Sequence, residues 1–175
     1  MKICNALVYT EDNGFMQMDV LVKGDTIEAV TPKEGLKEIA DEVTVDGTGM
    51  YLIPGLTDIH FHGCVGYDFC DGTEEAIGAI ARYQARNGVT TICPATMTYS
   101  EEILTGVCRS ARAYRDKAGA GAGREGKGRP AGAALVGINM EGPFISMEKK
   151  GAQNPAYIHR PDEAMFRRLQ READG

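Results

Sequence analysis

The pattern of apolar and polar positions changes at Pro54. Before this residue, short apolar runs rich in β-branched and aromatic residues alternate with polar turns, which is typical of β-structure. One weak helical signal interrupts this part, around residues 33–40. We expect strands at residues 2–10, 15–24, 26–30 and 42–55.

After Pro54, strand-like and helix-like segments alternate. Helices are expected at 73–88, with Thr73 as N-cap, and at 100–119, capped by Ser100. A third helix is expected to include 167–175. Strands are expected at 56–62, 89–96 and 134–141. Strands that alternate with helices over short connections predict right-handed βαβ units and a parallel sheet in the order of the chain.

A glycine-rich segment, 118–133, separates the second helix from the third strand. A phosphate-binding loop would need a strand before it and a helix after it, and here the order is reversed. We therefore interpret this segment as a surface loop without a binding site.

Composition indicates a globular protein, with 43% hydrophobic and 25% charged residues and a net charge of −6. The negative charge argues against a nucleic-acid binder, and no apolar run approaches the roughly 20 residues of a membrane span. The N-terminus has no apolar core typical of a signal peptide. The five cysteines include no C-x-x-C pair, which favours reduced thiols in a cytoplasmic protein.

Two of the three histidines lie in "TDIHFHG", at positions 60 and 62. In a strand, residues two apart share a face, so Asp58, His60 and His62 are expected to point the same way. A polar face on a central parallel strand is costly unless its groups have partners, and one metal ion would partner both imidazoles. The alternative is a pair of hydrogen-bonded histidines, because H-x-H alone is a weak motif.

Glu141 is expected at the C-terminal end of the third strand, before Gly142 and Pro143. Ligands of parallel sheets gather at this end of the strands, so Glu141 is expected to meet His60 and His62 there. The alternative is a solvated loop carboxylate. His159 is expected in a loop and exposed.

Four segments occur in order: "LIPGLTDIHFHG", "GVTTICPATMT", "GINMEGPFIS" and "KKGAQNPAYI". Together they resemble the N-terminal half of the N-acetylglucosamine-6-phosphate deacetylases, which belong to the amidohydrolase superfamily. The resemblance runs from about residue 3 to the end of the chain. P-G-x-x-D-x-H-x-H is shared by much of that superfamily, whereas M-E-G-P-F followed by K-G-A-Q-N-P is much narrower.

The resemblance implies an α/β fold: the first three β/α units of a (β/α)8 TIM barrel in 54–175, preceded in 1–53 by strands of a small β-sandwich. It implies Glu141, His60 and His62 as metal ligands: Glu141 matches the family's metal-binding glutamate, and the two histidines match the pair that holds a second metal in some members, whereas other members replace this pair and work with one ion. Ala152 and Gln153 match sugar-contacting positions, and some members have histidine at the latter. The catalytic aspartate of the family would lie beyond residue 175, so no catalytic residue is assigned in this chain.

The activity implied by the resemblance is metal-dependent hydrolysis of the acetamide of N-acetylglucosamine 6-phosphate to glucosamine 6-phosphate and acetate. Zinc is the expected divalent ion, with iron, manganese and cobalt as alternatives. The expected partner is a small amino sugar phosphate, without nucleic acid or membrane, and full-length members are expected to form homodimers. Three barrel strands carry an incomplete site, so the isolated chain is expected to be inactive. Two alternatives remain: a non-catalytic fragment that needs a complementary chain, or another superfamily hydrolase acting on a cyclic amide or a dipeptide.

Overall fold

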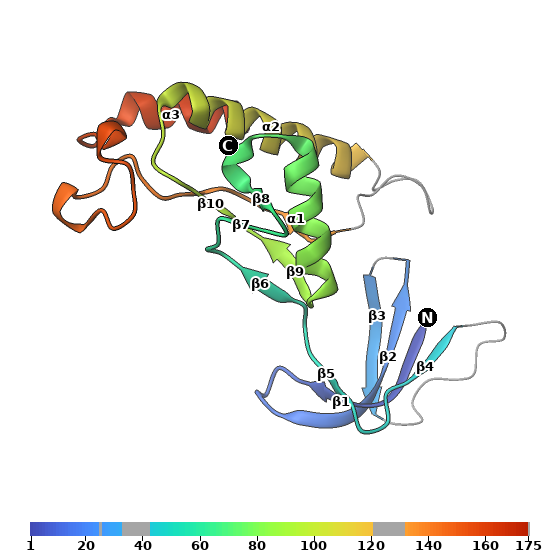
Figure 1. Cartoon of the computed structure of the whole chain (residues 1–175). Helices are drawn as coiled ribbons and strands as arrows, with labels where there is room; N and C mark the ends of the chain where they lie inside the picture. The colour runs from blue at the N-terminus through green and yellow to red at the C-terminus, as the bar shows by residue number, and fades with distance from the viewer. Residues whose placement is uncertain (25, 33–42, 121–131, 175) are drawn as a thin grey trace. The chain divides into compact units, whose positions relative to one another are not determined.

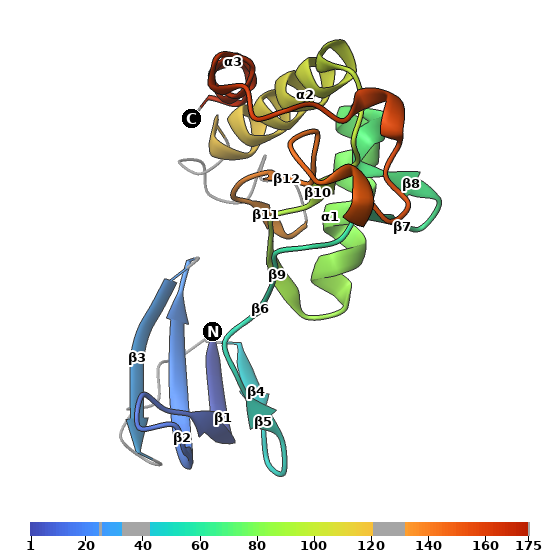
Figure 2. The same cartoon turned by 90° about the vertical axis from the view of Figure 1, so that its left-hand side faces the viewer.

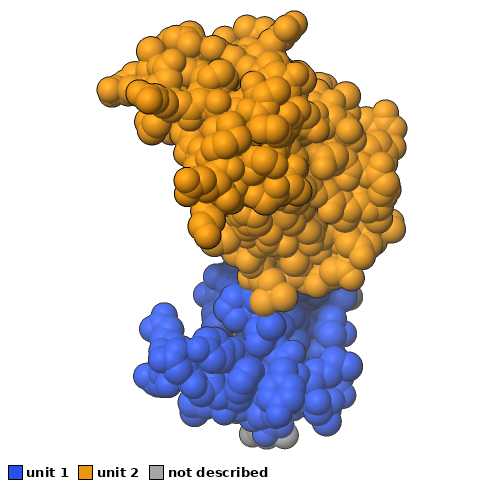
Figure 3. Space-filling view, turned by 60° about the vertical axis from the view of Figure 1, so that its left-hand side comes forward, with its two compact units in different colours: residues 1–54 blue, residues 55–175 orange. Residues whose placement is uncertain are grey.

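The structure is a computed structural model that describes residues 1–24, 26–32, 43–120 and 132–174. The described chain divides into two compact units, residues 1–54 and 55–175, which Figure 3 colours separately. The weak helix expected around 33–40 and most of the glycine-rich segment 118–133 lie outside the described residues.

Residues 1–54 form a β-sheet (Figure 1). Its strands are β1 (Lys2–Tyr9), β2 (Phe15–Lys23), β3 (Thr26–Pro32), β4 (Thr44–Asp46) and β5 (Tyr51–Leu52). The first three form an antiparallel meander, while β4 and β5 both pair with β1 in parallel. The strand expected at 42–55 is therefore two short strands, because Asp46 accepts hydrogen bonds from the backbone and hydroxyl of Thr48 and closes a turn.

Residues 55–175 are a mixed α/β unit (Figure 2). Its helices are α1 (Glu74–Arg86), α2 (Glu101–Ala120) and α3 (Glu163–Ala173), with short 3-10 turns η1 (Phe69–Asp71), η2 (Met147–Lys149) and η3 (Pro155–Tyr157). Its strands are β6 (Leu56–Asp58), β7 (Gly63–Cys64), β8 (Tyr67–Asp68), β9 (Val89–Ile92), β10 (Ala95–Thr96), β11 (Ala134–Leu135) and β12 (Asn139–Met140).

Strands β6, β9 and β11 form a parallel sheet in the order β11-β9-β6, as the strand–helix alternation predicts. β10 and β12 form a second parallel pair that follows β9 and β11 along the chain. The predicted helix starts are also confirmed, because Thr73 Oγ1 accepts from the backbone N–H of Ala76 and Ser100 Oγ accepts from that of Ile103.

The predicted strands are too long, and each break has a local cause. Proline lacks the N–H that a ladder needs, and Pro94 separates β9 from β10. In the expected strand 56–62, β6 ends at Asp58. Beyond it, the carbonyl of Asp58 accepts a hydrogen bond from the backbone N–H of Cys93, and the carbonyl of Phe61 accepts one from that of Ala95. The first segment thus advances three residues while its partner advances two, which is an irregular register. His60 and His62 therefore follow a strand, and strict alternation of faces does not apply to them.

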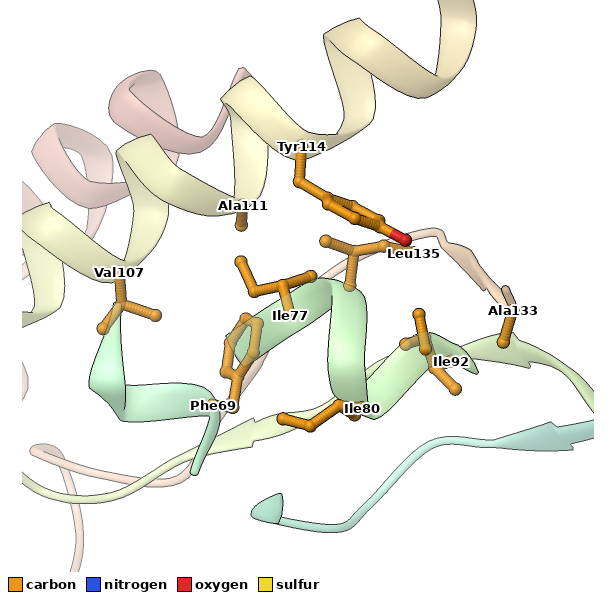
Figure 4. Close-up of a cluster of buried hydrophobic side chains, with 10 residues drawn as sticks. Phe69, Ile77, Ile80, Ile92, Val107, Ala111, Tyr114, Ala133 and Leu135 are labelled. Carbon is orange, nitrogen blue, oxygen red and sulfur yellow. The ribbon is translucent and has the colours of Figure 1, made fainter. Parts of the chain in front are cut away.

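A buried apolar cluster fixes the helices of this unit against its sheet. Figure 4 shows Val107 and Tyr114 of α2 near Ile77 of α1, with Ile92 of β9 below them. A second cluster joins α2 to α3 through Leu104, Cys108, Met165 and Leu169. These contacts hold the strand ends, and with them the segments that carry the polar residues described next.

Candidate metal centre

His60, His62 and Glu141 converge at the C-terminal ends of their strands. Glu141 follows β12 directly, and both histidines follow β6. Glu141 Oε2 lies 3.1 Å from His62 Nε2 and 3.4 Å from His60 Nε2. The ligand atoms of the three residues all lie within 4.8 Å of one another. The structure thus brings together the three residues singled out in the sequence. All three follow the end of a strand, so they do not share the face of one strand.

His62 is held by the neighbouring strand β10. Its Nδ1 lies 3.2 Å from the carbonyl oxygen of Ala95, which can only accept a hydrogen bond. Nδ1 of His62 therefore carries a proton, and in the neutral ring Nε2 presents a lone pair toward Glu141. This is the arrangement typical of histidine ligands, whose second nitrogen donates to a carbonyl or carboxylate.

Oε2 of Glu141 lies within ion-pair distance of Nε2 in both imidazole rings. Apart from these two ring nitrogens, no group among the described residues pairs with the buried Oε2 atom. A carboxylate that faces two imidazole nitrogens is stabilised either by a ring proton or by a cation held between the three groups. Imidazole nitrogen and carboxylate oxygen are ligands for zinc, iron, manganese and cobalt, so the residues present fit a divalent metal.

Thr98 anchors the backbone that presents Glu141. Its side chain is 1% exposed, and its Oγ1 donates to the carbonyl of Glu141 at 3.3 Å. The next residue, Gly142, has φ +78°, and a Cβ there would lie 2.0 Å from Thr98 Oγ1. Only glycine fits this close approach with this backbone conformation. The sequence reasoning missed Thr98, because a single threonine after a strand has no spacing pattern that marks it.

Gln153 is buried beside Thr98. It is 4% exposed, its Oε1 accepts from the backbone N–H of Thr98 at 2.7 Å, and its Nε2 lies 3.6 Å from Met97 Sδ. Ala152, the other predicted sugar-contacting residue, is exposed. The amide of Gln153 thus ties the segment after η2 to the end of β10.

Asn139 is a further polar neighbour of the cluster. Its Nδ2 donates to the carbonyl of Ile59 at 2.9 Å and lies 3.2 Å from His60 Nδ1. Asp58 is not part of the cluster, because its Oδ1 accepts from the backbone N–H of His60. His159 is exposed, as expected for its loop position. The only sequence signal for Asn139 is its place on the strand that directly precedes Glu141.

No family model matches the chain. Two curated relatives match most of it. The N-acetylglucosamine-6-phosphate deacetylase of Haemophilus influenzae is 29% identical over 157 residues, which cover 89% of this chain and 37% of the relative. The enzyme of the same name from Bacillus subtilis is 32% identical over 157 residues, covering 87% of this chain and 36% of the relative. The chain is homologous to N-acetylglucosamine-6-phosphate deacetylases.

A solved structure of the deacetylase from Pasteurella multocida agrees with this homology. It superposes with a TM-score of 0.80 at 25% identity, covering 99% of this chain and 42% of the deacetylase. The mixed α/β fold therefore corresponds to the N-terminal part of deacetylase structures. The chain spans about a third of the length of the two curated relatives described above. In the described part of the chain, no helix has the length and apolar character to cross a membrane.

Proposed function

We propose that residues 1–175 are part of an enzyme that hydrolyses the acetamide of N-acetylglucosamine 6-phosphate to glucosamine 6-phosphate and acetate. The observation that carries this proposal is the convergence of the Glu141 carboxylate with the Nε2 atoms of His60 and His62, within a chain homologous to deacetylases. Homology supports the substrate, and the donor set supports the kind of chemistry.

At the level of the fold, we propose that residues 54–175 are the first three β/α units of a (β/α)8 barrel. The parallel order β6, β9, β11 with intervening helices supports this assignment. Residues 1–53 would supply strands of a small β-sandwich. The exposed apolar residues Leu56, Ile59 and Val136, which are 50 to 65% exposed, are consistent with further chain covering the second unit.

In the proposed site, Glu141 and His62 would hold a divalent ion, with His60 beside them. Such an ion lowers the pKa of water and polarises a carbonyl, which is the chemistry that amide hydrolysis requires. Ala152 and Gln153 would lie near the sugar, with the buried amide of Gln153 holding the segment in place. The general base would come from an aspartate on a later strand. Zinc is the proposed ion, and iron, manganese and cobalt are alternatives.

An amino sugar phosphate is the proposed partner, in a cytoplasmic protein that forms homodimers in its full-length form. A second candidate is a non-catalytic fragment that binds a complementary chain, and the exposed apolar side chains named above favour it. The two candidates differ in whether the covering chain restores turnover.

An acetate-release assay tests the proposed function. We expect negligible deacetylation by residues 1–175 alone, because the ligands and general base from later strands are missing. The same residues joined to the remaining part of the Bacillus subtilis relative should be active. Glu141→Gln should remove most of that activity, whereas Glu148→Gln, an exposed acid in η2, serves as the matched control. A folded fusion without activity would overturn the proposal, and robust turnover by residues 1–175 alone would contradict the account of an incomplete site.

A further inference from the structure

The two histidines of the cluster differ in what faces their Nδ1 atoms. His62 Nδ1 faces a carbonyl oxygen, whereas His60 Nδ1 faces the side-chain amide nitrogen of Asn139 at 3.2 Å. Because a neutral imidazole carries one proton, the partner of Nδ1 decides whether Nε2 is a donor or an acceptor. In this cluster, Nε2 is the atom that points toward Glu141 in both rings.

The orientation of the Asn139 amide follows from its other partner. Its Nδ2 lies 2.9 Å from the carbonyl oxygen of Ile59, which can only accept, so this atom is the amide nitrogen and not the oxygen. The second N–H of the same group is then available to His60 Nδ1. His60 Nδ1 accepts this hydrogen bond, and the proton of the neutral ring lies on Nε2.

We propose that Asn139 is a positioning residue that holds His60 in the tautomer protonated on Nε2 and thereby makes the two histidines unequal as metal ligands. This inference deepens the proposed metal centre and rests on it. His62 Nε2 and Glu141 take the ion first. His60 donates from Nε2 toward the site, and it becomes a ligand only after its proton moves to Nδ1 and the contact with Asn139 is lost.

Among the described residues, the hydrogen-bond partner of His60 Nδ1 is the amide nitrogen of Asn139. Histidine ligands usually donate their second N–H to a carboxylate or carbonyl, and His62 follows this rule. The nearest acid in sequence, Asp58, uses its Oδ1 to accept from the backbone N–H of His60. The sequence pattern H-x-H therefore does not reveal that the two histidines have different Nδ1 partners. This difference arises from Asn139 on the neighbouring strand β12.

Nitrogen NMR of the metal-free chain tests the tautomers directly. The chain has three histidines, so selective ¹⁵N-histidine labelling gives a simple spectrum, in which the exposed His159 is a reference. The spectrum is recorded at about pH 8.5, and it shows for each ring which nitrogen carries the proton. We expect the proton on Nδ1 in His62 and on Nε2 in His60. A proton on Nδ1 of His60 would overturn the proposal.

Replacing the hydrogen-bond donor that faces His60 Nδ1 with an acceptor gives a second test. Asn139→Asp replaces the donor with an acceptor, which favours the Nδ1 proton and frees Nε2, so zinc should bind about tenfold more tightly. His60→Ala added to this variant should abolish the gain. Asn87→Asp is the charge-matched control, because the Asn87 amide likewise donates to a carbonyl, that of Tyr83, away from the cluster. A folded Asn139→Asp variant without the gain, or a gain that survives His60→Ala, would contradict the role of Asn139.

The tautomer measurement separates this inference from the proposed function. The expected tautomers in a chain that binds no zinc would support the role of Asn139 and contradict the metal centre. Zinc binding with both histidines protonated on Nδ1 would support the metal centre and contradict the role of Asn139.

Discussion

Three polar side chains at the ends of strands define the candidate centre of this chain. Glu141 Oε2 lies 3.1 Å from His62 Nε2, and among the described residues it pairs only with the two ring nitrogens of the cluster. His60 lies slightly farther from the same oxygen, at 3.4 Å, and has a different Nδ1 partner. The three side chains are close in space but unequal in chemistry, which leads to a prediction about their relative importance.

We expect His62→Ala to weaken zinc binding by more than about tenfold and His60→Ala to weaken it less. The reason is that His62 presents a lone pair without rearrangement, whereas His60 must first move its proton. Competition with a fluorescent zinc chelator measures both affinities. His159→Ala, which removes the exposed histidine, is the control. Equal losses for the two cluster histidines would contradict this ranking.

Two buried cysteines are expected to make the folded state less stable at alkaline pH. Burial raises the pKa of the Cys70 and Cys108 thiols from 9.0 to about 11. Between these pH values the unfolded chain loses thiol protons that the folded chain keeps, so stability should fall as pH rises from about 9 to about 11. Below pH 9 both states keep the protons and the contribution is constant. Urea unfolding at pH 8 and pH 10.5 should show a smaller decline in the Cys70→Ala/Cys108→Ala variant, and an unchanged decline would refute this explanation.

The residues of the cluster could be predicted from the sequence, but their hydrogen-bond partners could not. H-x-H and a glutamate at a strand end are patterns with a chemical meaning, and the structure places His60, His62 and Glu141 together. Asn139 and Thr98 have no such pattern, because their importance comes from neighbours 79 and 43 residues away along the chain. Metal binding itself remains a prediction from the donor set.

At the scale of elements, helix starts were predictable, whereas strand ends were not, and the third helix, expected to include 167–175, ends at Ala173 because Asp174 takes a left-handed backbone conformation. Thr73 and Ser100 cap their helices through local hydrogen bonds that a sequence encodes directly. The breaks in the strands depend on long-range pairing, such as the irregular register of the segment after Asp58 against Cys93 and Ala95. The predicted parallel order is correct because it follows from the alternation of elements and not from their exact lengths.

The packing of α3 on α2 should depend on apolar contacts more than on ion pairs. Leu169 is 3% exposed in the cluster with Leu104, Cys108 and Met165. We expect Leu169→Ala to lower the free energy of unfolding by about 2–5 kcal/mol. Arg168 pairs with Glu101 on the surface, where solvent screens the charges, so Arg168→Ala should have a much smaller effect. Urea denaturation measures both, and the reverse order would contradict this account of the packing.

The turn after β12 should control the position of the Glu141 carboxylate. In Gly142→Ala, the new Cβ would lie 2.0 Å from Thr98 Oγ1 and would displace the turn, so zinc binding should weaken. Gly88→Ala is the matched control, because Gly88 has φ +83° and a Cβ added there would meet nothing within 4 Å. Both variants share the strain of a positive φ, about 1–2 kcal/mol, but only the first disturbs the centre. Equal zinc affinities in the two variants would contradict this role of the turn.

At the scale of the whole molecule, the chain carries a part of a larger homologous fold. It aligns over 99% of its length with 42% of a deacetylase structure, and its second unit exposes Leu56, Ile59 and Val136. We expect co-expression with the remaining part of the Bacillus subtilis relative to raise the denaturation midpoint of residues 1–175, because binding stabilises the folded state. Thermal unfolding of the purified chain with and without this partner measures the effect. An unchanged midpoint would count against a complementary chain on this surface.

The most direct test of the metal centre is a zinc titration of the purified chain by equilibrium dialysis. The arrangement of His62 and Glu141 predicts one bound equivalent, with affinity lowered more than about tenfold in Glu141→Gln because a neutral amide is a poorer ligand than a carboxylate. The control Glu148→Gln should bind as the unchanged chain does. Equal zinc binding by the unchanged chain and by Glu141→Gln would contradict the proposed centre.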